Sequence, residues 1–280
     1  MARGPVILDG TAAAERRLRR LARRAGAGPG PGLGIIVATD NRATYTYIEQ
    51  KRRRAEAVGC RVVIDDLGPR ATERELLEAC GRMNRSRRVT GYIVQLPLPR
   101  GIDPIRIFAA VDPAKDADGL SPENLGRLYT ARPGILPATP KGILELLRDY
   151  RIDPKGMHVT VVGKGLLTGL PLGTLLSHRG ATVTSCDKLT RDLSAHTRTA
   201  DLLVTAAGKP GLITARMVRK NAVVVDVGAT RVKTRLSGDV DFAGVSKKAR
   251  AITPVPGGVG PMTVVSLLEN VYALAETGPR

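Results

Sequence analysis

Aromatic residues are scarce in this 280-residue sequence, which contains no tryptophan, two phenylalanines and six tyrosines. Proteins that bind single-stranded nucleic acid commonly stack the bases on aromatic side chains, so this scarcity argues against that class. No apolar run in the chain reaches the roughly 18 residues that a membrane-spanning helix requires. Hydrophobic residues make up 42% of the chain and charged residues 25%, which excludes a disordered or collagen-like protein. The sequence therefore predicts a folded globular protein.

Motifs for disulfides and metals are also missing. The three cysteines, Cys60, Cys80 and Cys186, form no C-x-x-C pair, and the three histidines form no H-x-x-x-H pair. Three nearby acids, Asp112, Asp116 and Asp118, lack the spacing of a calcium-binding EF-hand loop. We therefore expect no metal site. Residues 1–10 contain no long apolar segment of the secretory type, and the isolated cysteines suit a reducing compartment, so we expect a cytoplasmic protein.

Positive charge dominates, because 44 lysines and arginines against 26 acids give a net charge of +18. A basic excess is typical of nucleic-acid-binding proteins. Here, however, the basic residues are dispersed apart from residues 16–24 and 51–54, and no zinc-finger, KH or RRM motif is present. We favour solvated helix faces that attract anionic small molecules. A nucleic-acid-binding protein on a reused fold remains the alternative of a different class, which a salt-sensitive shift assay would detect.

Short strands rich in valine and isoleucine alternate with helical patterns, as in parallel βαβ units. The predicted strands are Leu33–Ala38, Arg61–Asp65, Thr90–Gln95, His158–Val162, Thr182–Cys186, Leu202–Ala206, Ala222–Val227 and Ala251–Thr253. The predicted helices are Ala12–Ala25, Ala43–Val58, Glu73–Arg85, Lys141–Tyr150, Leu170–His178, Ala215–Arg219 and Met262–Ala275. This alternation predicts an α/β fold, with a separate doubly wound domain in the second half that begins near residues 136–140.

A glycine-rich turn follows the strand predicted over residues 158–162. Gly163, Gly165 and Gly169 are spaced G-x-G-x-x-x-G, one residue longer than the usual dinucleotide-binding pattern. Glycines at such a turn let the backbone approach a pyrophosphate at a helix N-terminus. The next strand ends before Asp187, where a dinucleotide fold holds the adenosine ribose. The pattern predicts a nucleotide site, and a tight turn that binds nothing is its alternative.

Three residues of the first half could carry acid–base or ligand chemistry. Tyr47 and Lys51 lie four residues apart on a predicted helix, so they share one face. A hydroxyl beside an amine can help it carry protons, although a core tyrosine beside a surface lysine explains the spacing better on its own. Gln95 ends an otherwise apolar strand, where parallel sheets place ligands, and an amide that bonds the nearby backbone is an equal alternative.

Together these segments resemble the bifunctional methylenetetrahydrofolate dehydrogenase/methenyltetrahydrofolate cyclohydrolase (FolD) family. The matching motifs are Tyr47–Lys51, Val94–Pro99, Lys115–Gly119, Ala200–Leu202, Gly208–Gly211, Asp226–Gly228, Gly238–Phe242 and Thr253–Thr263. They keep the family's order and spacing over essentially the whole chain. The resemblance implies a folate-binding catalytic domain over residues 1–120 and a Rossmann-like NAD(P)-binding domain with a parallel sheet over residues 121–280. The last helix, about residues 262–277, is expected to pack back on the first domain.

The resemblance also implies a pair of reactions and the residues that serve them. Methylenetetrahydrofolate is oxidised with NADP to the methenyl form, which water opens to formyltetrahydrofolate. Lys51, Tyr47 and Gln95 are implied as catalytic residues, with Lys51 moving protons, Gln95 holding it and Tyr47 contacting the folate. Asp118, Gly258 and Pro261 are implied, with Tyr47, as substrate-binding residues. A homodimer is implied by the family alone, with no membrane partner.

The implied cofactor-binding residues are Gly163, Lys164, Gly165, Asp187, Lys188 and Ala229. Here the sequence departs from the family, since Gly165 replaces a serine, Thr168 a valine and Ala138 the cysteine of a P-C-T-P segment. Asp187 would repel the 2′-phosphate of NADP, whereas Lys164 and Lys188 would attract it. We expect NADP as the cofactor, with NAD also possible. A paralogue that is mainly a cyclohydrolase, with a weakened or NAD-linked dehydrogenase step, is the alternative within the same fold.

Overall fold

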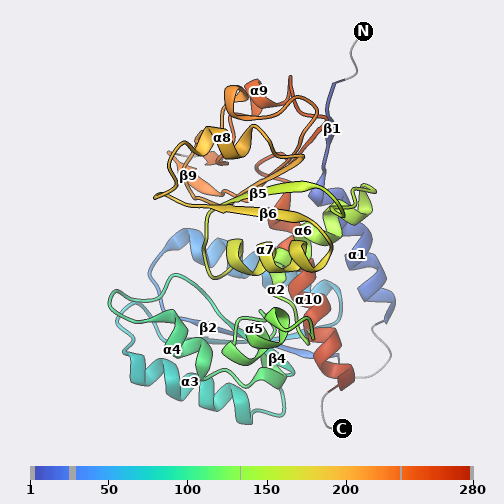
Figure 1. The fold of residues 1–280 in the computed structure, drawn as a ribbon. Helices are drawn as coiled ribbons and strands as arrows, with labels where there is room; N and C mark the ends of the chain where they lie inside the picture. The colour runs from blue at the N-terminus through green and yellow to red at the C-terminus, as the bar shows by residue number, and fades with distance from the viewer. Residues whose placement is uncertain (1–3, 25–29, 133, 234, 278–280) are drawn as a thin grey trace. The chain divides into compact units, whose positions relative to one another are not determined.

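The computed structural model describes residues 4–24, 30–132, 134–233 and 235–277. The chain divides into two compact units, one built from residues 1–15 and 139–263 and the other from residues 16–138 and 264–280. We call them the 139–263 unit and the 16–138 unit. Both are α/β (Figure 1), in agreement with the predicted fold class. Division by chain order at residue 120 differs from these units, because each of them takes one end of the chain.

The 16–138 unit contains a three-stranded parallel sheet in the order β3-β2-β4. Its strands are β2 (Gly32–Val37), β3 (Arg61–Asp66) and β4 (Gly91–Val94). In Figure 1, α2 (Arg42–Ala57) and α3 (Glu73–Arg85) lie on opposite sides of this sheet. The central strand β2 is buried along its whole length, because helices cover both faces of a parallel sheet. Three short elements complete the first part of the unit, α4 (Pro104–Ala109), the 3₁₀ helix Pro113–Lys115 and α5 (Pro122–Tyr129).

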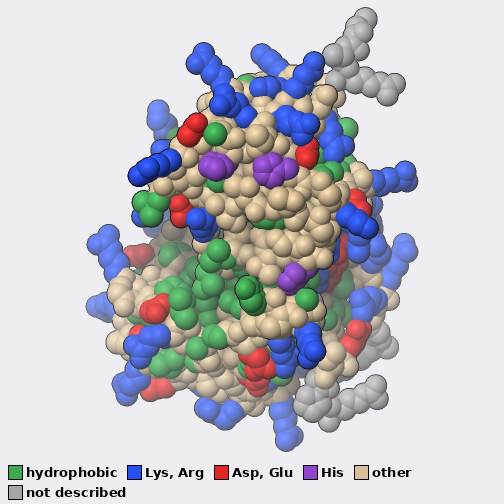
Figure 2. All heavy atoms as spheres, viewed as in Figure 1, with side chains coloured by type: hydrophobic (Ala, Val, Ile, Leu, Met, Phe, Trp, Pro, Cys, Tyr) green, Lys and Arg blue, Asp and Glu red, His purple; other side chains and the backbone are tan. Residues whose placement is uncertain are grey.

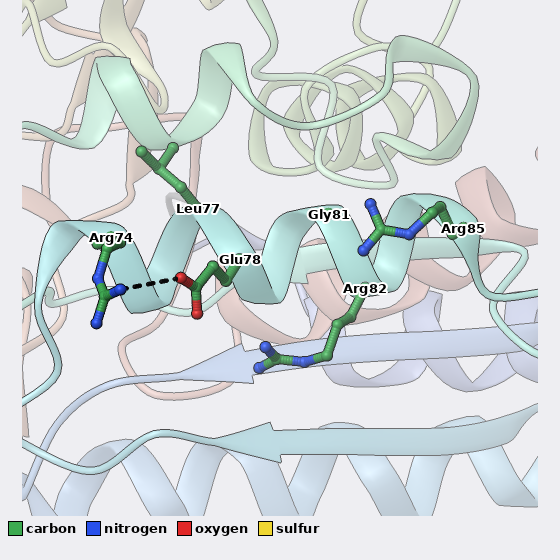
Figure 3. A pocket seen from close by; sticks show the side chains of 6 residues that line it. All are labelled: Arg74, Leu77, Glu78, Gly81, Arg82 and Arg85. Carbon is green, nitrogen blue, oxygen red and sulfur yellow. Dashed lines mark ion pairs between the residues drawn. The ribbon is translucent and has the colours of Figure 1, made fainter.

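Helix α3 shows how local sequence sets an element. Thr72 and Glu75 form a capping box, in which the Glu75 carboxylate accepts the Thr72 N–H at 2.8 Å. The apolar residues Leu76, Ala79, Cys80 and Met83 recur at helical spacing and are buried. The opposite face carries charged side chains around a surface hollow of about 530 Å³, which Figure 3 shows beside Gly81. None of the residues expected to act in catalysis lines this hollow.

The 139–263 unit contains a six-stranded parallel sheet in the order β1-β11-β8-β7-β5-β6. The strands are β1 (Val6–Ile7), β5 (His158–Val162), β6 (Thr182–Cys186), β7 (Leu202–Thr205), β8 (Val223–Asp226) and β11 (Ala251–Ile252). In Figure 1, α7 (Gly169–His178) and α8 (Leu193–Thr197) lie on opposite sides of β5 and β6, as in a doubly wound fold. The unit also contains an antiparallel hairpin, β9 (Thr230–Val232) and β10 (Arg235–Ser237), and the short helix α9 (Phe242–Val245).

The helices α1 (Gly10–Arg24), α6 (Ala138–Asp149) and α10 (Val259–Thr277) include the boundaries between the units. Within the 16–138 unit, Asn270 of α10 donates hydrogen bonds to the carbonyl oxygens of Ala117 at 2.9 Å and Leu136 at 2.8 Å. Arg17 of α1 pairs with Glu269 at 2.8 Å, and both side chains are largely buried. The C-terminal helix is thereby tied to the unit that contains residues 16–138.

All eight predicted strands are present, and the bounds of β5, β6 and α3 are as predicted. The helix predicted over residues 215–219 is wrong, because only a 3₁₀ turn, Ala215–Met217, forms there. Strand β1, the β9–β10 hairpin and the helices α4, α5, α8 and α9 were not predicted, because segments of two to eight residues carry little periodic signal. In the described ranges, no helix is long and apolar enough to cross a membrane.

Candidate active site

Lys51 and Gln95 meet although 44 residues separate them. Buried Ile48 and Ala55 anchor α2, which leaves Lys51 half-buried on an adjoining face of the helix. Its Nζ donates a 2.8 Å hydrogen bond to Oε1 of Gln95, the residue that follows β4. The other end of the amide donates to the Leu96 carbonyl oxygen at 2.8 Å, which fixes the amide's orientation. Lys51 is therefore not a free surface lysine. The Gln95 amide does bond the nearby backbone, as its alternative interpretation expected, but it also accepts a hydrogen bond from Lys51.

The negative charge of Asp118 acts on this amine. Burial lowers the pKa of Lys51, and the negative charge of Asp118 opposes that shift. Burial also raises the pKa of Asp118 to about 6, against the opposing effect of the Lys51 cation, while the charge of Asp116 adds to the rise. The pKa of the Lys51 amine is lowered and the pKa of the Asp118 carboxyl is raised, so both pKa values shift toward neutral pH. Such a pair is suited to proton transfer.

Two of the charged residues in the segment Lys115–Gly119 serve the fold. Lys115 Nζ donates to the Ser86 carbonyl oxygen at 2.7 Å, just beyond the end of α3. Asp116 is buried, and its Oδ1 and Oδ2 accept the N–H groups of Gly119 at 2.8 Å and Ser121 at 2.7 Å. Asp112 likewise caps the 3₁₀ helix through the Ala114 N–H. The described residues contain no group of three or more histidines, cysteines or acids that could hold a metal.

Gly119 sets the direction of Asp118. Its φ of +69° lies in the left-handed region, and an added Cβ would lie 2.6 Å from the carbonyl carbon of Leu136. The Asp118 carbonyl oxygen accepts the Ala138 N–H at 3.2 Å. The backbone on both sides of Asp118 is therefore held, while no described side chain forms a hydrogen bond with its carboxylate.

The remaining predicted folate residues lie in different places. Tyr47 is 43% exposed, so it is not a core tyrosine. Gly258 and Pro261 belong to the 139–263 unit, where Gly258 is buried and Pro261 is in the first turn of α10. An added Cβ on Gly258 would lie 2.5 Å from the Pro254 carbonyl oxygen. Close packing of the segment requires a glycine there, whatever else the residue does.

The three glycines of the turn in the 139–263 unit differ in whether the packing requires a glycine. Gly163 has a φ of +110°, and an added Cβ there would lie 2.3 Å from the Ala206 carbonyl oxygen. An added Cβ on Gly169 would lie 1.7 Å from the Gly163 carbonyl oxygen. Gly165 instead faces open space, with no atom within 4 Å of its Cβ position. Thr168 makes no side-chain cap on α7. In the first turn, the Leu170 N–H donates to the Gly165 carbonyl oxygen at 3.2 Å and Pro171 has no N–H, so this helix end offers an anion few N–H donors.

Lys164 and Asp187 form an ion pair at 3.3 Å, with side chains that are 40% and 31% exposed. The Leu189 N–H and the Lys164 ammonium lower the pKa of Asp187, so its carboxylate is charged. Lys188 and Ala229 are exposed. Lys164 and Asp187 are expected from the sequence to act in opposite ways on a 2′-phosphate, whereas in the structure the two charges are paired with each other.

Two buried acids had no role assigned from sequence, although both lie in matched motifs. Asp226 and Asp239 are 3% and 0% exposed. Burial raises the pKa of Asp226 to about 6, against three backbone N–H groups that lower it. Their place in the matched motifs Asp226–Gly228 and Gly238–Phe242 was the signal that the sequence offered for these residues.

Comparison with known proteins also divides the chain into two parts, although by chain order and not at the bounds of the two compact units. Residues 8–118 match the family described as tetrahydrofolate dehydrogenase/cyclohydrolase, catalytic domain, and residues 137–278 match the NAD(P)-binding domain of the same family. The bifunctional protein FolD of Methanosphaerula palustris is 43% identical over 272 residues, which cover 97% of each protein. The crystal structure of the bifunctional enzyme FolD from Campylobacter jejuni is 39% identical, with a TM-score of 0.93 over 97% of this chain and 99% of that one. The Trypanosoma brucei enzyme, solved with NADP and an inhibitor, is 36% identical, with a TM-score of 0.95 over 98% of both chains. This chain therefore belongs to the tetrahydrofolate dehydrogenase/cyclohydrolase family.

Proposed function

We propose that this protein oxidises 5,10-methylenetetrahydrofolate to the 5,10-methenyl form with NADP and then hydrolyses that product to 10-formyltetrahydrofolate. The observation that carries the proposal is the Lys51–Gln95 hydrogen bond beside Asp118, in the part of the chain that matches the family's catalytic domain. Within the proposal, residues 1–120 serve the folate and residues 121–280 serve the cofactor. The proposal also includes a homodimer, which the family resemblance implies, and a cytoplasmic location, which the isolated cysteines support.

The proposed chemistry assigns Lys51 the proton transfers of the hydrolytic step. When bound, NADP accepts a hydride from the methylene carbon. Water then attacks the methenyl carbon, and neutral Lys51 takes the proton that the water loses. The proton is returned to the nitrogen that leaves when the ring opens, and the second proton of the water is released to solvent as the hydroxyl becomes the formyl C=O. Because burial lowers the pKa of Lys51, more of the amine is neutral at pH 7 than for an exposed lysine.

Gln95 and Asp118 position the partners of this step. The Gln95 carbonyl oxygen holds the amine, and its own orientation is held by the backbone of Leu96. A carboxylate at Asp118 suits the paired N–H donors of a pterin ring, because charge-assisted hydrogen bonds are the stronger kind. Tyr47 is exposed and lies four residues before Lys51 on α2, which supports a contact with the same ligand.

The cofactor is proposed to bind at the carboxyl ends of β5 and β6. Gly163 and Gly169 keep the turn tight, and the open space at Gly165 leaves room in front of α7. Lys164 and Lys188 supply positive charge, Asp187 lies at the end of β6, and Ala229 follows β8. The Lys164–Asp187 pair favours, as a second candidate, an enzyme whose dehydrogenase step is weakened or also uses NAD.

The nucleic-acid alternative gains no support from the face of the protein shown in Figure 2. Figure 2 shows lysine and arginine side chains spread over the visible face with acids among them, rather than gathered into one basic surface. Several arginines are paired with acids, among them Arg52 with Glu56 and Arg82 with Asp65. Dispersed and paired charge is suited to small anions and not to a continuous phosphate backbone.

The test is to follow the absorbance of methenyltetrahydrofolate with purified protein in three conditions. With methylenetetrahydrofolate we expect methenyl formation with NADP, less with NAD and none without cofactor. With methenyltetrahydrofolate we expect decay faster than in buffer, with no cofactor needed. Decay without any cofactor-dependent formation would identify the second candidate, and the absence of both activities would refute the proposal.

A further inference from the structure

Asp239 is a completely buried carboxylate whose two oxygens both accept hydrogen bonds from the segment after β7. Oδ2 accepts the N–H of Ala207 at 2.7 Å and of Gly208 at 3.2 Å, and Oδ1 accepts the N–H of Lys209 at 2.8 Å. Oδ2 also accepts the Thr205 hydroxyl at 3.0 Å. One buried side chain thus accepts hydrogen bonds from three consecutive backbone N–H groups.

Asp226, the last residue of β8, holds Asp239 in turn. Its Oδ1 accepts the N–H of Asp239 at 3.0 Å and of Gly228 at 2.9 Å, and its Oδ2 accepts the N–H of Val240 at 2.9 Å. The packing admits no extra atom, since a Cβ on Gly228 would lie 2.3 Å from Asp239 Oδ1. A Cβ on Gly238 would lie 2.0 Å from Asp226 Oδ2. Asp226 and Asp239 therefore form one closely packed network of hydrogen bonds.

The segment that Asp239 holds, residues 207–209, is exposed on its outer side. It follows β7, which pairs in parallel with β5, so it lies at the same sheet edge as the glycine turn. The contact is close, because the Ala206 carbonyl oxygen lies 2.3 Å from the Cβ position of Gly163. The segment after β8 joins it, through a 3.2 Å hydrogen bond from the Thr230 hydroxyl to the Gly208 carbonyl oxygen. In open parallel sheets this edge is where the ligand binds.

We infer that Asp239 is a positioning residue for NADP, which sets the loop of residues 207–209 against the glycine turn so that the edge of the sheet matches the cofactor. This inference rests on the proposed function, because it concerns the same cofactor site. Asp239 itself does not reach the surface, so it acts through the backbone of the loop. A loop with an exposed outer side and an anchored inner side presents its backbone to a ligand at little cost in ordering.

The test variant is Asp239→Asn, which keeps the size of the side chain. An amide has one acceptor oxygen, so whichever way it is oriented its Nδ2 faces at least one N–H that the carboxylate accepted. One charge-assisted hydrogen bond corresponds to roughly 10- to 150-fold in an equilibrium constant. Because this bond lies within the protein, we expect its loss to lower the thermal unfolding midpoint as well as to disorder the loop. We therefore expect the Kd and KM for NADP to rise by about tenfold in the folded variant, with cyclohydrolase activity changed far less.

Asp241→Asn is the matched control. Asp241 is exposed two residues further on and caps α9 through the Gly244 N–H, with no bond to residues 207–209. We expect this variant to bind NADP as the parent does, in titration calorimetry with NADP and in dehydrogenase kinetics. An unchanged Kd for Asp239→Asn would overturn the inference, and so would an equal loss of cyclohydrolase activity, which would indicate a general structural role. A parent that fails to bind NADP would overturn it as well, whereas a parent that binds NADP without turnover would refute only the proposed function.

Discussion

Lys51→Met is the change that tests the proposed chemistry most directly. Methionine has a similar length but no amine, so the variant loses both the proton acceptor and the 2.8 Å hydrogen bond to Gln95. Removal of a general acid–base group costs about 10²–10⁴ in rate, or about 3–5 kcal/mol in the activation free energy. We expect hydrolysis of methenyltetrahydrofolate to fall by this factor. The fold should persist, because the substitution removes a charge whose burial is unfavourable.

The size of the effect follows from the protonation state of the amine. An amine with the ordinary pKa of 10.5 is neutral in only about 3 molecules in 10⁴ at pH 7, and each unit of lowering raises that fraction tenfold. Lys51 is lowered by burial, so its loss removes a base that is already enriched in the active form. Hydride transfer moves no proton through Lys51, so the dehydrogenase step should lose less than the hydrolytic step.

The assay follows the decay of methenyl absorbance without cofactor, and NADPH formation with it. Lys51→Met also removes the cation that lowers the pKa of Asp118, so that pKa should rise above about 6. Measurement at pH 8 as well as pH 7 separates this effect on folate binding from the loss of the base. Lys220→Met, at an exposed lysine of the 139–263 unit, is the matched control. Near-normal hydrolysis by Lys51→Met at both pH values would remove Lys51 from the mechanism.

Three further predictions follow from the described geometry. Asp118→Ala should weaken folate binding far more than NADP binding. In the parent, folate affinity should fall as the pH drops through about 6, because protonation removes the carboxylate that accepts the pterin donors. Titration of both ligands from pH 5 to 8 checks both expectations. Asp187→Ser should free Lys164 and raise the ratio of kcat/KM for NADP over NAD, whereas Lys188→Ala should lower it, and a strict preference of the parent for NAD would contradict this view of the cofactor site. Gly169→Ala should lower the free energy of unfolding by about 1–3 kcal/mol in urea denaturation, since its Cβ would overlap the Gly163 carbonyl oxygen, and unchanged stability would show that the turn can relax.

The local sequence determined most of the fold. Valine- and isoleucine-rich runs located the strands, since parallel strands buried on both faces are short continuous apolar runs. The capping box at Thr72 and the periodic apolar residues of α3 set its bounds for the same reason. The β9–β10 hairpin was missed, because its three-residue strands carry no comparable pattern.

The tertiary structure decided which of the chemically suitable residues can take part in catalysis or ligand binding. Asp116 and Asp118 are two residues apart and look alike in sequence. The carboxylate of Asp116 accepts backbone N–H groups, whereas that of Asp118 interacts with the charge of Lys51. The partners of Lys51 and of Asp239 lie 44 and about 30 residues away in the chain. Burial and long-range pairing set the pKa of a group and its hydrogen bonds. These depend on how the elements pack, and that information is absent from the spacing of residues along the chain.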